Sequence, residues 1–162
     1  MEQKQYIKRK DIIRIVEAYS DLLLRIAVNR VRSISEGEDI VQSVFVKLLT
    51  AQPKFADFEH ERKWLIRTTV NLCKDYRKSA TRRECEVLDE NLAGEMPAES
   101  TEVLDALYQL PENDRYAIFL YYYERMTIRE IADVTSEHEG TIASRLSRGR
   151  KKLRSILKGG QL

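Results

Sequence analysis

The sequence predicts an all-α protein made of two small helical domains joined by a flexible acidic linker. Nearly every apolar stretch repeats at helical spacing, and the alternating pattern of strands is almost absent. That periodicity fails between Ser79 and about Ser100, where Gly94, Pro97 and many acids occur. The 162 residues, of which 43% are hydrophobic and 33% charged, suffice for two modest cores. The expected boundaries are residues 1–80 for the first domain, 81–101 for the linker and 102–162 for the second domain.

The first domain is expected to contain three helices. A long amphipathic helix covers Asp11 to about Arg32. After a break at Ser35–Gly37, a second apolar stripe runs over Ile40–Leu49 and ends before Pro53. The third helix is predicted over Lys63–Lys78, with its aliphatic residues facing inward.

The second domain is expected to contain four shorter elements. A helix over Val103–Leu110 is stopped by Pro111, and the next one runs from Glu112 to about Glu124. Thr127–Val134 and about Glu139–Leu157 complete the set. The last two form a helical corner, because a small residue in the shorter helix lets the longer one cross closely.

The final pair of helices has the character of a helix-turn-helix. Ser136 followed by Glu139 predicts a capping box at the start of the second helix. That helix has an apolar face and, opposite it, a face of basic and hydroxyl side chains. Guanidinium groups can fork onto guanine edges, and Lys, Ser and Thr can hold phosphates, so this face suits the major groove of DNA. The alternative is a plain solvated surface, which the preceding short helix and turn argue against. The predicted DNA-contacting residues are Thr141, Ser144, Arg145, Arg148, Lys151 and Lys152.

The segment from Leu104 to Leu153 resembles region 4 of the extracytoplasmic-function sigma factors, whose helix-turn-helix binds the −35 promoter element. The chain departs from the family in the turn, with Ser136 where Gly is usual and Glu137 where an apolar residue is usual. The residues that match are Leu110, Pro111, Arg115, Glu130, Ile131, Ala132, Gly140, Thr141, Ser144, Arg145, Leu146, Arg148 and Arg150.

Residues Glu36–Leu49 resemble region 2.2 of the same family, the helix that docks on the clamp helices of the largest RNA polymerase subunits. Glu38, Asp39 and Gln42 are expected to face outward as an acidic and amide patch that pairs with basic groups. Ser43 replaces the usual Glu. Taken alone, such a patch is more often ordinary surface.

The segment that starts at Phe58 resembles regions 2.3 and 2.4, which open the duplex and bind the −10 element. A polar loop at Asp57–Arg62 is expected to accept a flipped base while cations hold the strand. The cations form a stripe opposite the apolar face of the third helix. The residues of this predicted −10 stripe are Arg67, Asn71, Lys74 and Lys78.

Two aromatic features are interpreted as packing rather than base stacking. Trp64 begins an amphipathic helix, so we expect it in the core. Because neighbouring helical residues face different sides, one or two rings of Tyr121–Tyr123 are expected between helices.

The sequence shows no pattern typical of an enzyme. Cys73 and Cys85 lack metal-ligand spacing and are interpreted as reduced thiols. His60 and His138 are expected in surface loops, without a phosphate loop or nucleophile motif. We therefore predict no catalysis, no metal and no cofactor. A helix-turn-helix repressor or activator would leave the −10 stripe without a role, and a protein-binding adaptor would not need two DNA-like faces.

The resemblance implies a sigma factor that binds core RNA polymerase through the clamp helices and the flap, and positions it on promoter DNA. It also implies an anti-sigma protein that clasps both domains. No apolar run approaches the ~20 residues that span a bilayer, so we expect no membrane insertion and a cytoplasmic location.

Overall fold

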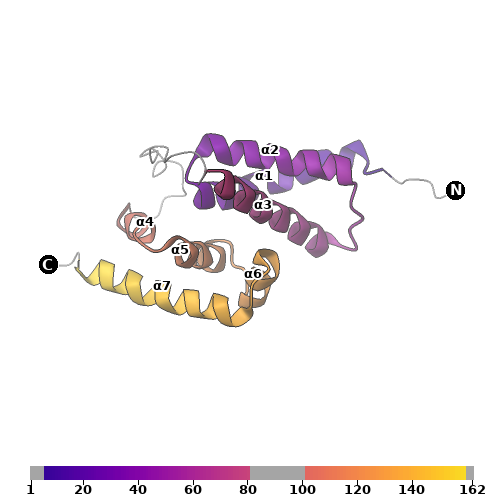
Figure 1. Cartoon of the computed structure of the whole chain (residues 1–162). Coiled ribbons are helices and arrows are strands. Elements are labelled where there is room, and N and C mark those ends of the chain that lie inside the picture. The colour runs from indigo at the N-terminus through magenta and orange to yellow at the C-terminus, as the bar shows by residue number, and fades with distance from the viewer. Residues whose placement is uncertain (1–5, 81–100, 160–162) are drawn as a thin grey trace. The chain divides into compact units, whose positions relative to one another are not determined.

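The computed structural model describes residues 6–80 and 101–159, and every regular element in those ranges is a helix (Figure 1). The chain divides into two compact units, Met1–Glu86 and Val87–Leu162. The all-α class and the two helical domains predicted from the sequence are thereby confirmed. The predicted linker, residues 81–101, lies almost entirely outside the described residues.

The described part of the first unit consists of helices α1 (Arg9–Val31), α2 (Ile34–Ala51) and α3 (Phe58–Ala80), each in contact with the other two. Figure 1 shows them side by side, in indigo to magenta. Each turns an apolar stripe inward, as the periodicity predicted. Their shared core contains Leu23, Ile26, Val44, Leu48, Leu65 and Ile66, which are almost completely buried.

The connection between α1 and α2 is shorter than the sequence suggested. Arg32 takes a left-handed conformation with φ 57°, and the Ser33 hydroxyl accepts a hydrogen bond from the Glu36 N–H. The expected break at Ser35–Gly37 was wrong, because these residues lie in the first turn of α2. Gly37 is there for close packing: a Cβ atom at this position would lie 2.6 Å from Val28 Cγ2.

Helix α3 begins five residues before the predicted start at Lys63. The carboxylate of Asp57 accepts a hydrogen bond from the His60 N–H at 2.8 Å and so caps the helix. Most of the predicted loop Asp57–Arg62 is therefore helical, and His60 lies in the first turn rather than in a loop. The early start was missed because residues 58–62 carry no apolar stripe.

The inward residue of that first turn is a buried acid, Glu61, whose exposed fraction is 4%. Arg14 of α1 donates two hydrogen bonds to its carboxylate, at 3.0 and 2.7 Å. The hydrogen bond to Glu61 is the main reason that the pKa of Arg14 is raised. The same guanidinium lies 5.0 Å from the ring centre of Phe58. This ion pair joins the start of α3 to α1.

The described part of the second unit comprises α4 (Thr101–Tyr108), α5 (Glu112–Ile118), the π-helix η2 (Phe119–Tyr123), α6 (Ile128–Thr135) and α7 (Glu139–Gly159). The predicted helices are confirmed to within a few residues, whereas the π-helical turn was not predicted. Helix α7, yellow in Figure 1, packs against α4, α5 and α6. The core around it includes Leu104, Phe119, Leu120, Ile131, Ile142 and Leu146.

Candidate nucleic-acid and partner interfaces

The corner between α6 and α7 has the geometry of a helix-turn-helix, but its caps differ from those expected. A capping box lies at the start of α6, where the Glu130 N–H donates to the Thr127 hydroxyl at 3.1 Å and the Thr127 N–H donates to the Glu130 carboxylate at 2.8 Å. The predicted capping box at Ser136 and Glu139 was wrong, because Ser136 ends α6 instead of starting α7.

Ser136 takes the left-handed conformation, with φ 56°. Its N–H donates to the Asp133 carbonyl at 3.3 Å, and the Glu137 N–H donates to the Ala132 carbonyl at 3.0 Å. This pair of bonds is a Schellman ending, which glycine occupies most readily. The family's usual Gly at this position therefore has a conformational reason, and Ser136 keeps the same turn.

The two faces of α7 separate as predicted. Ile142, Leu146 and Gly149 are buried, and a Cβ atom at Gly149 would lie 2.9 Å from Ile118 Cγ1, so α5 and α7 cross closely there. On the opposite side, Ser144, Arg148, Lys151 and Lys152 are exposed, whereas Thr141 and Arg145 are half-buried.

Two arginines of the predicted DNA face already have carboxylate partners within their own unit. Arg145 contacts Glu137 through both terminal nitrogens, at 2.7 Å and 2.6 Å, and its side chain is only 17% exposed. Arg148 makes a single contact of 3.3 Å with Asp114 and is 61% exposed. Arg148 is thus accessible, while the fork of Arg145 is occupied.

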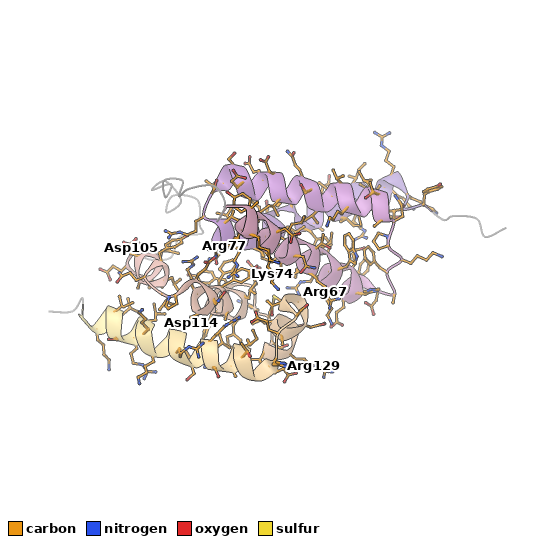
Figure 2. The ribbon with its side chains drawn as sticks, in the orientation of Figure 1. Arg67, Lys74, Arg77, Asp105, Asp114 and Arg129 are labelled. Atoms are coloured by element: carbon orange, nitrogen blue, oxygen red, sulfur yellow. The ribbon has the colours of Figure 1, made fainter. Side chains whose placement is uncertain are left out.

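The predicted −10 stripe lies along one side of α3. Asn71 and Lys78 are exposed, and Figure 2 shows Arg67 and Lys74 projecting from the same side of the helix. Arg77, the neighbour of Lys78, is a further cation of α3 that was not predicted from the sequence. Burial, and then the charge of Arg30 on α1, lowers the pKa of Arg77. Positive charge is therefore concentrated towards the end of α3.

The aromatic rings near the start of α3 pack on one another. Phe55 contacts the ring of His60 and that of Trp64 edge-on, with ring centres 5.6 and 5.9 Å apart. His60 Nδ1 also accepts a hydrogen bond from the Ala56 N–H at 3.1 Å. Trp64 is half-buried in this cluster rather than deep in the core.

The outward side of α2 combines acidic, amide and apolar groups. Glu38, Asp39 and Gln42 are exposed, as expected from the sequence. Val46 and Leu49 continue the same side and are 57% and 46% exposed. Leu49 was expected in the inward stripe, and that expectation was wrong. We refer to these five residues as the α2 surface.

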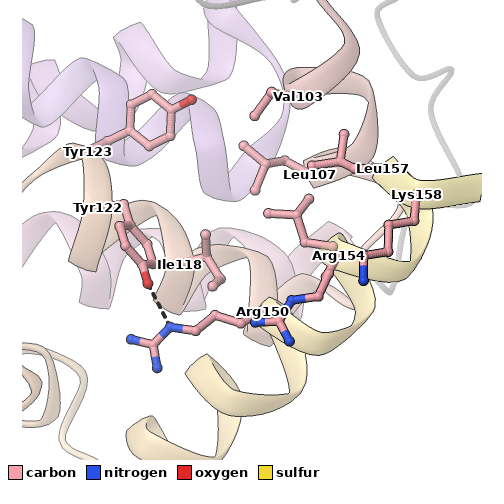
Figure 3. A pocket seen from close by; sticks show the side chains of 10 residues that line it. Val103, Leu107, Ile118, Tyr122, Tyr123, Arg150, Arg154, Leu157 and Lys158 are labelled. Carbon is pink, nitrogen blue, oxygen red and sulfur yellow. Dashed lines mark hydrogen bonds between the residues drawn. The ribbon is translucent and has the colours of Figure 1, made fainter. Parts of the chain in front are cut away.

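A groove with a volume of about 680 Å³ lies between α4, α5, η2 and α7 (Figure 3). Leu107, Ile118 and Leu153 contribute to its apolar wall. Arg150, Arg154 and Lys158 are exposed and give it a basic rim along α7. Among the described residues, those that line this groove include no acid, so it favours an occupant with both apolar and acidic side chains.

The tyrosine cluster belongs to the edge of this groove. Arg150 Nε donates a hydrogen bond of 2.6 Å to the Tyr122 hydroxyl, drawn in Figure 3. The guanidinium lies 5.4 and 5.5 Å from the ring centres of Tyr121 and Tyr122. Tyr122 is exposed, whereas Tyr121 and Tyr123 are half-buried, and the Tyr123 ring stacks on the buried Phe119 ring with centres 5.6 Å apart. None of the three rings is fully buried in the core, and Tyr122 and Tyr123 line the groove.

Comparison with known proteins agrees with this geometry. The family model for sigma-70 region 2 matches residues 15–83, and the model for sigma-70 region 4 matches residues 100–153. The chain is 26% identical to the ECF RNA polymerase sigma factor SigW of Bacillus subtilis over 168 residues, covering 89% of this chain and 87% of that protein. It is also 26% identical to SigV of the same organism, covering 95% of each.

Solved structures show the same fold. The sigma factor RpoE from Bartonella quintana, solved in complex with the anti-sigma factor NepR, superposes with a TM-score of 0.76 at 22% identity and covers 92% of this chain and 98% of its own. CnrH, solved with the cytosolic domain of CnrY, gives a TM-score of 0.65 at 21% identity over 94% and 90% of the chains.

A helical unit with a charged α3 stripe, followed by a helix-turn-helix unit, is the architecture of a promoter-recognition protein. The chain belongs to the sigma-70 family, and its relatives place it among the ECF RNA polymerase sigma factors. It is thus a non-catalytic subunit that directs RNA polymerase to specific promoters. No helix within residues 6–80 and 101–159 is long and apolar enough to cross a membrane.

Proposed function

We propose that the two units contact two separate promoter elements, the first unit the −10 element and the second the −35 element. The main support is α7: exposed cations lie on one side of it, and the residues buried against α5 and α6 lie on the other. Such a helix can enter the major groove without exposing apolar surface. Its DNA-contacting residues are Thr141, Ser144, Arg145, Arg148, Lys151 and Lys152.

The −10 element is assigned to α3 because its polar stripe carries three cations and an amide. Single-stranded DNA is held by cations along its backbone, and its bases are accessible once they are unstacked. Since residues 58–62 are helical, a flipped base would be accepted beside the start of α3, near Phe55 and His60, and not in a long polar loop. The stripe consists of Arg67, Asn71, Lys74 and Lys78.

Core polymerase is assigned to the α2 surface. Its acidic and amide groups suit basic groups on a partner, and the exposed Val46 and Leu49 add the apolar area that a stable interface needs. By the family resemblance, the partner elements are the clamp helices of the largest subunits, with the flap as the contact of the second unit.

An anti-sigma protein is proposed as a further partner. RpoE was solved with the anti-sigma factor NepR bound, and CnrH with the cytosolic domain of CnrY. The groove beside α7 supports such a contact, because its apolar wall and basic rim suit an amphipathic helix with acidic flanks. The proposed contact with polymerase supports a cytoplasmic location.

The decisive experiment is to ask whether the purified chain co-elutes with bacterial core RNA polymerase and starts transcription from a promoter that core alone ignores. Co-elution and promoter-specific transcripts are expected. Tight binding to duplex DNA by the chain alone, without polymerase association, would instead favour a helix-turn-helix repressor or activator.

A further inference from the structure

The contact between Glu137 and Arg145 occupies the part of the arginine that would bind DNA. Glu137 lies in the turn before α7, and Arg145 lies two helical turns later. Nη1 of Arg145 donates to Oε1 of Glu137 at 2.7 Å, and Nη2 lies 2.6 Å from Oε2. With exposed fractions of 17% and 28%, the two side chains are partly shielded from water.

A guanidinium binds a guanine edge or a phosphate through a pair of parallel N–H donors. In Arg145, the pair formed by the two terminal nitrogens is already held by a carboxylate of the same bidentate geometry. A guanidinium has a second such edge, formed by Nε and one terminal nitrogen, but DNA that approaches the Nη1 and Nη2 edge must displace Glu137. Glu137 and DNA therefore compete for the same donors.

We propose that Glu137 is a specificity-determining residue that withholds Arg145 from DNA unless the sequence offers a strong two-pronged acceptor. The inference rests on the proposed role of α7 at the −35 element. At other sequences, Arg145 stays with Glu137, and the fixed carboxylate repels phosphates nearby. The affinity for non-specific DNA is thereby lowered more than the affinity for the promoter. The ratio of specific to non-specific affinity rises.

Arg148 provides the internal comparison. It lies on the same helix, but its single contact with Asp114 is 3.3 Å long and its side chain is 61% exposed. Arg148 is available to any duplex. The two arginines therefore have different roles. Arg148 contributes to the affinity for every DNA sequence, and Arg145 contributes mainly to the affinity for the correct sequence.

The test uses the full chain in complex with core polymerase. The probes are a promoter duplex selected by that complex from a library with a randomised −35 element, and the same duplex with the −35 element scrambled. Glu137→Gln keeps the shape but removes the charge, and Glu137→Leu installs the apolar residue usual in the family. Glu139→Gln is the matched control, because it removes an exposed acid two residues further along.

Glu137→Gln should tighten binding to the scrambled duplex about tenfold, and tighten binding to the selected duplex less, so that discrimination falls. Freeing one cation should also steepen the salt dependence by about one unit of log K per log salt. Arg145→Ala should not tighten scrambled binding in the wild-type background, because the unpaired Glu137 carboxylate then repels phosphates more strongly. In the Glu137→Gln background, Arg145→Ala should abolish the gain in affinity for the scrambled duplex. Glu139→Gln should change the affinity for both duplexes equally.

The proposal is overturned if both Glu137 variants weaken the selected duplex without tightening the scrambled one, since Glu137 would then orient Arg145. It is also overturned if the Glu137 variants leave the affinity for both duplexes unchanged. Failure of the −35 assignment looks different: Arg145→Ala and Arg148→Ala would both leave binding to the selected duplex unchanged.

Discussion

Arg14 of α1 and Glu61 of α3 form a two-pronged ion pair, in which the carboxylate is buried and the guanidinium is 40% exposed. The pair fixes the end of α3 from which the −10 stripe extends. Burial, and then the Glu61 carboxylate, raises the pKa of Tyr19, which marks the same apolar environment. The two partners are not equivalent. Arg14 can reach water when Glu61 is removed, whereas Glu61 stays buried when Arg14 is removed.

Arg14→Met should therefore destabilise the first unit more than Glu61→Gln. Loss of the arginine leaves a buried charge unpaired, which costs about 3 kcal/mol. Loss of the acid leaves Arg14 able to turn towards solvent, so the cost is nearer ~1 kcal/mol. Urea unfolding at neutral pH measures both free energies. The double variant Arg14→Met, Glu61→Met should recover most of the loss; equal losses in the two single variants would contradict the asymmetry.

Replacing each of two helical glycines by alanine should change the stability of the protein in opposite directions. Gly37→Ala places a methyl group against Val28 Cγ2 and should lower the free energy of unfolding by about 1–3 kcal/mol. At Gly140 a Cβ atom would meet open space, so Gly140→Ala should raise the free energy of unfolding by about 0.5–1 kcal/mol. Thermal melting of the two variants tests the pair, and a gain in stability for Gly37→Ala would argue against the close crossing of α1 and α2.

Ser136→Gly should stabilise the turn between α6 and α7 by about 1 kcal/mol, because the left-handed conformation carries no steric penalty for glycine. Ser136→Ala, which keeps the Cβ atom, is the control and should bring no such gain. The comparison requires only urea unfolding curves. If both variants behave alike, conformational strain at this position is not what limits stability.

The buried thiol of Cys73 should make stability fall at alkaline pH. Burial raises its pKa from 9.0 to about 12. The unfolded thiol therefore ionises first, and the stabilisation is complete below pH 9 and is lost as the pH rises towards 12. In a Cys85→Ser background, the stability difference between wild type and Cys73→Ala should shift against the wild type by about 1 kcal/mol between pH 8 and pH 10. A pH-independent difference would show that the thiol is exposed.

Changes on the α2 surface should weaken polymerase binding and leave the fold intact. Asp39→Ala removes an exposed charge, and Val46→Asp places a charge on the exposed apolar part. Each is expected to reduce affinity for core polymerase about tenfold, since charged and apolar centres of interfaces carry much of the binding energy. Glu17→Ala, an exposed acid on α1, is the matched control and should bind normally in a competition assay. Normal binding by Asp39→Ala and Val46→Asp would place the polymerase contact elsewhere.

The order of the helices and their inward faces followed from apolar periodicity, because each helix packs one stripe on its neighbours. Periodicity did not reveal which stripe residues the neighbours cover. Leu49 continues the apolar pattern of α2, yet it lies partly beyond the reach of α1 and α3 and is 46% exposed. The start of α3 was marked only by the cap at Asp57, which charged residues follow.

The candidate site was predictable in composition but not in pairing. The basic face of α7 is visible in the sequence, whereas the Glu137–Arg145 contact depends on how the chain turns between α6 and α7. The letters Ser-x-x-Glu at residues 136–139 fit either a helix start or a helix end. The packing of α6 on α7 selects the left-handed Ser136, and no local pattern contains that information.

The π-helical turn Phe119–Tyr123 also has a consequence for how partners are distinguished. A π-turn is an α-helix with one extra residue, and each residue of an α-helix advances the side chains by about 100°. Deleting a single residue here would rotate Tyr122 away from Arg150 and reshape the groove, while α7 kept every side chain of its proposed DNA face. The proposed partner groove and the proposed DNA face can thus be altered independently, by changes at different places in the same small unit.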